Sequence, residues 1–247
     1  MTIAKPCLIQ TPTDIRKSYE AAISENPANA SYTSSGRQKR AVGAHTKYWK
    51  SGRTLKIAIT DYGDGGFEIV KNAIKKWQPY VNLKFEFVEL HDNDELFEGD
   101  IRIYLTSLTN GVGKSAIGTD ALTVSSLKPT MQLGTNYTST GYEALVLHEF
   151  GHALGFMHEH QHPDANIPWN REATYLQYNR EVGWSRDVVD GAVFPMPRDT
   201  GLTYEPYDRH SIMHYNVLNI CTIGDWEQAV NLKLSAGDKA FARKVYP

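Results

Sequence analysis

Three histidines and a glutamate near the middle of the chain have the types and spacing of a hydrolytic metal site. His148 and His152 are four residues apart, so on a helix they lie one turn apart and face the same way. Two imidazoles in this arrangement can bind one metal ion, while Glu149 is placed to hold a metal-bound water. Gly155 would let the helix end and the chain turn sharply, which returns His158 as a third ligand. The stretch therefore predicts a zinc site.

Such a site performs hydrolysis with an activated water. Three imidazoles leave one coordination position for water, and zinc lowers the pKa of that water from about 16 toward about 7. Glu149 can then accept the proton and deliver it to a leaving amine. A structural zinc site would instead be closed by four ligands, commonly including cysteine, and no cysteine lies near this stretch. The residues predict peptide hydrolysis without a covalent intermediate.

The extended motif resembles that of the metzincin metallopeptidases, and sequence further along the chain resembles the astacin family. The stretch Ser211-Ile212-Met213-His214-Tyr215 is similar to the astacin Met-turn, in which the methionine underlies the three histidines. This resemblance implies that Tyr215 is a displaceable extra zinc ligand that stabilises the oxyanion. It also implies that Glu159, directly after the third histidine, meets the new N-terminus of a processed enzyme. The nearby His160, His162, His210 and His214 are assigned no metal role.

The resemblance covers roughly residues 47–247 and implies roles for two further segments. Residues 110–118 would form the upper rim of the cleft, where the backbone of Lys114, Ser115 and Ala116 could pair with an extended substrate. Residues 235–246 would be the C-terminal helix of the family. The chain departs from the family at Gln161-His162-Pro163-Asp164-Ala165, where astacins usually continue toward Arg-x-Asp-Arg. Contacts in the lower half of the cleft are therefore not inferred from the family.

The elements that must position these residues alternate between strand and helix patterns. Strands are predicted at residues 55–60, 83–90, 101–105 and 131–133, and helices at residues 67–77, 140–158, 170–182 and 235–246. Capping boxes are expected from Thr140 to Glu143 and from Ser235 to Asp238. The Gly-, Pro- and Tyr-rich stretch 183–209 is expected to be irregular. Residues 111–119 contain glycines but match neither the phosphate-binding loop nor the dinucleotide-binding motif. We therefore interpret them as a loop or an exposed strand.

This order of elements, together with the resemblance, predicts an α+β, metzincin-like fold. We expect a twisted, mostly parallel sheet with an edge strand, and an active-site helix above the cleft. An irregular lower subdomain would follow and end in the C-terminal helix. The expected organisation is an N-terminal arm at residues 1–40 and one peptidase domain at residues 41–247, with an upper part at 41–158 and a lower part at 159–247.

The N-terminal arm has the composition of an extended segment with at most one short helix, around residues 14–24. It ends in Arg37-Gln38-Lys39-Arg40, which is either a solvated charge run or a processing site between a propeptide and an enzyme. Astacin-like enzymes are commonly made as zymogens, so the resemblance favours an arm that lies across the cleft until cleavage near Ala41. Cys7 is a candidate inhibitory zinc ligand, or else an inert free thiol.

Composition excludes several other classes of partner. A net charge of −2 gives no reason to expect nucleic acid or an anionic membrane, and no apolar run approaches the roughly 18 residues of a membrane span. Two cysteines, Cys7 and Cys221, leave the redox compartment open. We expect a monomer with one catalytic Zn²⁺ that acts on protein or peptide substrates and is secreted; an effector exported into a host cell is the alternative.

Two other functions remain open. The first is a catalytically silent zinc-binding protein that keeps the fold for partner recognition, although Glu149 and Tyr215 argue against it because a binder needs neither. The second is a metzincin peptidase outside the astacins, which absence of Tyr215 from the zinc site would favour.

Overall fold

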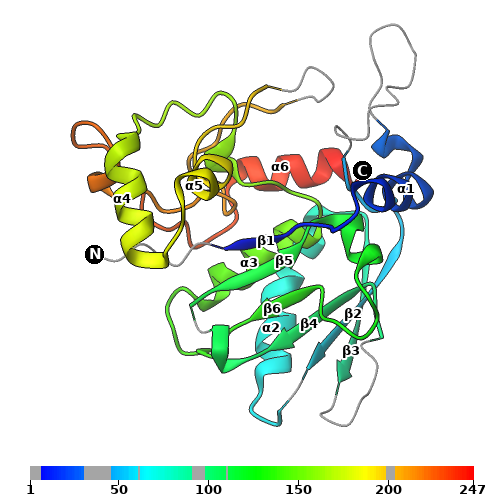
Figure 1. Cartoon of the computed structure of the whole chain (residues 1–247). Helices are drawn as coiled ribbons and strands as arrows, with labels where there is room; N and C mark the ends of the chain where they lie inside the picture. Colours follow the sequence, from blue (N-terminus) through cyan, green and yellow to red (C-terminus); the bar gives the residue numbers. More distant parts are fainter. Residues whose placement is uncertain (1–6, 31–45, 61, 91–97, 110, 199–203) are drawn as a thin grey trace, which may run out of the picture.

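The computed structural model describes residues 7–30, 46–60, 62–90, 98–109, 111–198 and 204–247. Its strands are β1 (Leu8–Gln10), β2 (Thr54–Thr60), β3 (Lys84–Leu90), β4 (Ile101–Leu105), β5 (Gly113–Ala116) and β6 (Met131–Leu133). Its α-helices are α1 (Ile15–Glu25), α2 (Gly66–Ile74), α3 (Tyr142–Ala153), α4 (Arg171–Val182), α5 (Arg186–Ala192) and α6 (Ala236–Val245). These elements confirm the predicted α+β class (Figure 1).

A single mixed sheet has the strand order β1-β5-β6-β4-β2-β3. β5 and β6 run antiparallel, and the other neighbouring strands run parallel, as predicted for a mostly parallel sheet. The stretch interpreted as a loop or exposed strand is β5, and β1 of the arm pairs with its outer edge, with Ile9 opposite Ser115. Ser115 is consequently 1% exposed, so β5 is a buried strand while the arm is in place.

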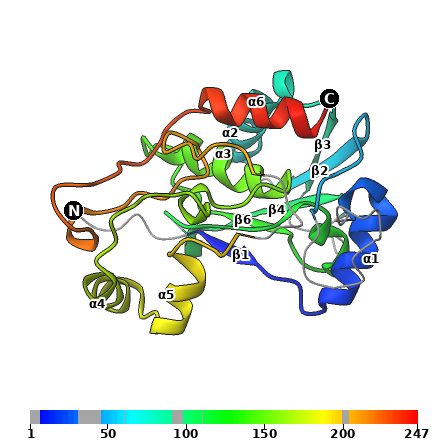
Figure 2. The same cartoon turned by 90° about the horizontal axis from the view of Figure 1, so that it is seen from above.

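Helices cover one face of this sheet. α3 packs against α2, β5 and β6, and Figure 2 shows α2, α3 and α6 on the same side of the strands. The largest fully buried side chains of the core include Trp49, Trp77 and Phe150. The indole N–H of Trp49 donates to Ala153 O at 2.8 Å, and that of Trp77 donates to Leu147 O at 3.1 Å. Two tryptophans thus hold the backbone of α3 against the core.

The start of α3 differs from the prediction. Thr140 and Glu143 form no capping box, because the helix begins one residue later, with Gly141 as an N-cap that makes no side-chain hydrogen bond. Glu143 instead pairs with Lys76 at 2.6 Å. The Glu143 carboxylate, which the sequence pattern placed at the helix N-terminus, thus pairs with a lysine of another element.

The lower part of the chain is more regular than predicted. α4 begins where expected, with Asn170 as its N-cap. Within residues 183–209, however, α5 follows a Ser185 N-cap, and a small core joins it to α4; that core consists of Tyr178, Val189, Val193 and Phe194. A helix of seven residues is too short to show a clear periodicity in the sequence, so it was missed.

The C-terminal helix α6 has the predicted capping box. The Ser235 hydroxyl accepts from the backbone N–H of Asp238, and the Asp238 carboxylate accepts from the backbone N–H of Ser235. Among helices in the described part of the chain, none is both long and apolar enough to cross a membrane.

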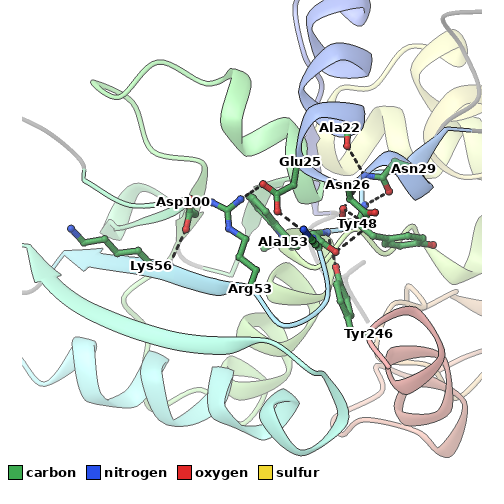
Figure 3. A network of polar contacts seen from close by, with 12 residues as sticks. Ala22, Glu25, Asn26, Asn29, Tyr48, Arg53, Lys56, Asp100, Ala153 and Tyr246 are labelled. Atoms are coloured by element: carbon green, nitrogen blue, oxygen red, sulfur yellow. Dashed lines mark hydrogen bonds and ion pairs between the residues drawn. The ribbon is translucent and has the colours of Figure 1, made fainter.

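Within the described residues of the N-terminal arm, α1 is the short α-helix expected there, and Asn29 anchors the end of that segment. Asn29 is 1% exposed. Its Nδ2 donates to Ala22 O at 2.9 Å and to Tyr48 O at 2.8 Å, and its Oδ1 accepts from Tyr48 N at 2.9 Å (Figure 3). One amide therefore joins the end of the arm to the first described segment of the domain.

Ion pairs add a second set of contacts between the arm and the domain. Glu25 of α1 pairs with Arg53, which also pairs with Asp100 (Figure 3). Ser18 of α1 donates to the buried Asp120, which also pairs with Lys47. The arm is thus docked by its helix as well as by β1. The basic cluster at residues 37–40 lies outside the described residues.

Close packing between α3 and the loop beneath it yields a stability prediction. A Cβ at Gly151 would collide with the sulfur of Met213, so we predict that Gly151→Ala lowers the free energy of unfolding by about 1–3 kcal/mol. Gly191→Ala in α5 is the matched control, because a Cβ there meets no atom within 4 Å; it should raise stability by about 0.5–1 kcal/mol. Urea unfolding measures both, and equal stabilities would contradict the prediction.

Candidate metal centre and its cleft

The predicted histidines meet in one buried cluster. α3 carries His148 and His152, and the chain turns just after the helix at Gly155, whose φ of +94° favours glycine. This turn brings back His158. The donor atoms of the three rings and the Sγ of Cys7 all lie within 4.8 Å of one another. The structure therefore brings together all three predicted ligands and the candidate inhibitory cysteine.

The hydrogen bonds of the rings define which nitrogen carries the proton. The Nδ1 of His148 donates to Ile212 O at 2.8 Å, and that of His152 donates to Phe156 O at 2.7 Å. A carbonyl can only accept, so Nε2 of each neutral ring keeps a lone pair. Burial lowers the pKa of His148 to about 4 and holds those of His152 and His158 well below their usual value. The rings are therefore neutral at pH 7.

The Nε2 atoms of the rings lie close together. His152 Nε2 lies 3.0 Å from His158 Nε2, and His148 Nε2 is buried without a partner among the described residues. Buried polar atoms without partners cost free energy, which a cation between them would recover. Three converging imidazole nitrogens suit Zn²⁺. The donor set thus fits one zinc ion held by these three histidines.

Glu149 lies beside the cluster and is fully buried. Its Oε2 accepts from Cys7 Sγ at 3.2 Å, and its Oε1 has no partner within the described parts of the chain. A Cβ at Gly113 in β5 would overlap the carboxylate, so only glycine leaves room for it. Burial raises the pKa of Glu149 to about 8, which suits a group that must both accept and return a proton near neutral pH.

Tyr215, two residues after Met213, lies against the same cluster of histidines. Its ring centroid lies 4.4 Å from that of His158, and the ring stacks on His160 at 4.1 Å. Its hydroxyl donates to the backbone oxygen of Cys7 at 2.6 Å. The arm thus accepts a hydrogen bond from the hydroxyl group that, according to the resemblance, would stabilise the oxyanion.

Cys7 contacts the site with both its side chain and its backbone. Burial raises the pKa of its thiol, and the negative charge of Glu149 raises it further. A cation among the neighbouring rings would favour the thiolate instead. We therefore expect Cys7 to be a thiolate, and hence a ligand, only with a metal bound nearby. The second cysteine, Cys221, is buried far along the chain, in the short helix η6 (Asn219–Cys221).

Met213 and Glu159 belong to two segments that contact each other next to the cluster. Met213 is 3% exposed, and its sulfur lies against Gly151 of α3, as the Met-turn resemblance implies. Glu159 donates its backbone N–H to Met213 O at 3.1 Å, and its Oε1 accepts from Asp208 N at 2.7 Å. Burial raises the pKa of Glu159 to about 7. Its expected partner near Ala41 lies outside the described residues.

The expected substrate strand lies at the edge of the cleft. Lys114, Ser115 and Ala116 belong to β5, whose inner edge pairs with β6 and whose outer edge pairs with β1. The backbone groups that could bind an extended substrate are therefore engaged by the arm.

A cavity of about 260 Å³ opens beside His148 and Tyr215. Its walls come from Cys7 of the arm, the loops before β5 and α3, the first half of α3, the Met-turn and the loop after it, and include Leu145, Ile212, Asn216, Val230 and Asn231. Among the described residues that line it, none is aspartate, glutamate, lysine or arginine. His214 also lines it, and burial lowers the pKa of that ring to about 4. The cavity therefore carries no formal charge at pH 7.

Two residues of the site were not found by sequence reasoning. His160 supports the ring of Tyr215, and its Nε2 contacts Ala192 O at 3.0 Å. Gly113 clears space for Glu149. Neither has a local signal, because each acts on a residue distant in sequence.

The comparisons with known proteins agree with this geometry. The family model described as Astacin, a peptidase family, matches residues 42–231. Zinc metalloproteinase dpy-31 of Caenorhabditis elegans is 24% identical over 97% of this chain and 38% of its own length. Tolloid-like protein 2 of Mus musculus is 25% identical over 90% of this chain and 21% of its own. The chain thus spans well under half the length of these relatives.

A solved structure resembles the chain more fully. The structure of myroilysin has a TM-score of 0.72 and 35% identity, and the match covers 81% of this chain and 96% of that one. The family match, this likeness and the histidine cluster that fits zinc lead to one conclusion. The chain belongs to the astacin family of zinc metallopeptidases.

Proposed function

We propose that the chain is a zinc endopeptidase and that its N-terminal arm holds it in a latent form. The observation that carries the peptidase proposal is that three neutral, buried imidazoles bring their nitrogens within 4.8 Å of one another and of Cys7 Sγ, which contacts the buried carboxylate of Glu149 at 3.2 Å. The proposed domain is residues 41–247, and the proposed substrates are proteins or peptides. A silent zinc-binding protein would not need a buried carboxylate at this point.

His148, His152 and His158 would hold the ion. The chemistry supplied by bound zinc is polarisation of the scissile carbonyl and a water pKa lowered to about 7. Glu149 takes the proton of the attacking water on its carboxylate and returns it to the leaving amine. Tyr215 donates its hydroxyl to the oxyanion that develops on the scissile carbonyl. The backbone of β5 aligns the peptide.

The position of Cys7 supports the latency proposal. Its carbonyl accepts from the Tyr215 hydroxyl, and its Sγ lies against Glu149, so one arm residue engages both groups that would act on a substrate. β1 meanwhile occupies the outer edge of β5. Cleavage near Ala41 would allow the arm to leave, and Glu159 would then meet the new N-terminus. Such a latent form protects the producing cell, which favours secretion.

The test of the mechanism is Glu149→Gln in a chain whose arm has been removed by cleavage near Ala41. The amide cannot accept the proton, so kcat/KM for casein or a peptide should fall by about 10²–10⁴-fold with zinc retained. Glu143→Gln is the matched control, because Glu143 lies on the same helix but pairs with Lys76 at the surface, and it should keep full activity. Equal activity of the Glu149 variant and the wild type would exclude the mechanism. Absence of zinc in elemental analysis would exclude the whole proposal.

Latency can be tested with the two buried cysteines. In the intact chain, Cys7→Ala should raise activity by about tenfold or more, equivalent to at least 1.4 kcal/mol of lost inhibition. It should also remove the thiolate absorption band of the cobalt-substituted protein. Cys221→Ala should change neither, because Cys221 does not belong to the cluster. If Cys7→Ala left both the latency and the metal coordination unchanged, Cys7 would be an inert thiol.

The uncharged cavity predicts the specificity of the activated enzyme. A charged side chain would lose its hydration there without gaining a partner. Peptides with an uncharged residue next to the scissile bond should therefore be cleaved at least about tenfold faster than those with aspartate or lysine, equivalent to 1.4 kcal/mol. Val230→Arg should shift this preference toward acidic residues. Profiling a peptide library with both proteins measures it, and an unchanged profile would show that substrates do not enter this cavity.

A further inference from the structure

Asp238 makes more hydrogen bonds than the helix it caps requires. It belongs to the first turn of α6 and is 7% exposed. Its half of the capping box needs only one acceptor, and Oδ2 fills that role by accepting from Ser235 N at 2.8 Å. The rest of this buried carboxylate is turned toward a different element.

That element is the Met-turn. The Oδ1 of Asp238 accepts from the Ser211 hydroxyl at 2.6 Å, and Oδ2 also accepts from Ile212 N at 2.8 Å. The Ser211 hydroxyl in turn accepts from Met213 N at 3.0 Å. Hydrogen bonds to a charged acceptor are roughly twice as strong as those between neutral groups. One carboxylate therefore holds the start of the turn that passes beneath the three histidines.

Ile212 also contacts one of the proposed zinc ligands, through its carbonyl oxygen. Ile212 O accepts from Nδ1 of His148 at 2.8 Å, and this bond spans 64 residues of sequence. The corresponding carbonyl for His152 belongs to Phe156, only four residues away, so the turn after α3 already places it. His148 differs, because its carbonyl partner lies on a loop that belongs to no helix or strand. Something outside that loop must fix its position.

We propose that Asp238 is a positioning residue of the metal site. By binding the N–H of Ile212, it sets the carbonyl that orients the His148 ring and directs Nε2 at the ion. The inference rests on the proposed zinc site and assigns the C-terminal helix a part in it. Groups that orient metal ligands typically change metal affinity by about 10–100-fold when they are removed.

The test compares the zinc affinity of full-length variants by competition with a chelator. Asp238→Ala removes every acceptor and should weaken binding by about 10–100-fold. Asp238→Asn should restore affinity to within about threefold of wild type, because the amide oxygen can accept from Ile212 N while its NH₂ donates to the Ser211 hydroxyl. Ser235→Ala is the matched control. It loses the helix cap but leaves the contacts of Asp238 with the Met-turn in place, so it should lower the melting temperature without changing zinc affinity more than about threefold.

Ser211→Ala provides a second route if Asp238→Ala does not fold. It removes the Oδ1 contact and the support of Met213 N, and should weaken zinc binding in the same direction with α6 still capped. Unchanged zinc affinity in folded Asp238→Ala, or in Ser211→Ala if the first does not fold, would overturn the inference. So would a loss in Ser235→Ala equal to that in Asp238→Ala, because the effect would then be helix capping alone. A wild-type chain that binds no zinc would overturn the proposed function as well.

Discussion

The structure depends on burying three neutral imidazoles whose metal-binding nitrogens lie within 4.8 Å of one another. Two of their nitrogens, on His152 and His158, are 3.0 Å apart, and burial keeps all three rings uncharged. Such a cluster is unfavourable by itself and becomes favourable around a cation. His148 and His152 are each held by a hydrogen bond on the far nitrogen, to Ile212 O of the Met-turn and to Phe156 O after the helix end.

The local part of this arrangement could be predicted from the sequence. Spacing on one helix places His148 and His152 together, and a glycine at a positive φ returns His158, because neither depends on distant residues. The predicted capping box at Thr140 was wrong, and here a distant residue is involved: the Glu143 carboxylate pairs with Lys76 of another element. Short segments such as α5 also escaped, because seven residues carry too little periodicity.

The formation of strand β5 also depends on residues distant in sequence, including those of the arm. The sequence of residues 111–119 left a loop or an exposed strand open, and β5 forms there with β6 and β1 paired to its two edges. An unpaired sheet edge can bind any extended chain, and here that property serves the proposed function. The arm covers this edge and also contacts Glu149 and Tyr215, so the proposed latency and the protection of the edge would have one structural cause.

Tertiary hydrogen bonds that support the metal ligands come from the least regular segments. The partner of His148 is on a loop, and that loop is held by the first turn of the last helix. A metal bound to such a site stabilises every segment that supports it, because binding favours only the folded arrangement. Loss of the Asp238 carboxylate should therefore be felt at the ion, whereas loss of the Ser235 hydroxyl, which leaves the bonds of Asp238 to the Met-turn in place, should be felt at the helix cap alone. The C-terminal helix is thus coupled to the chemistry by one side chain, although it contributes no ligand to the site.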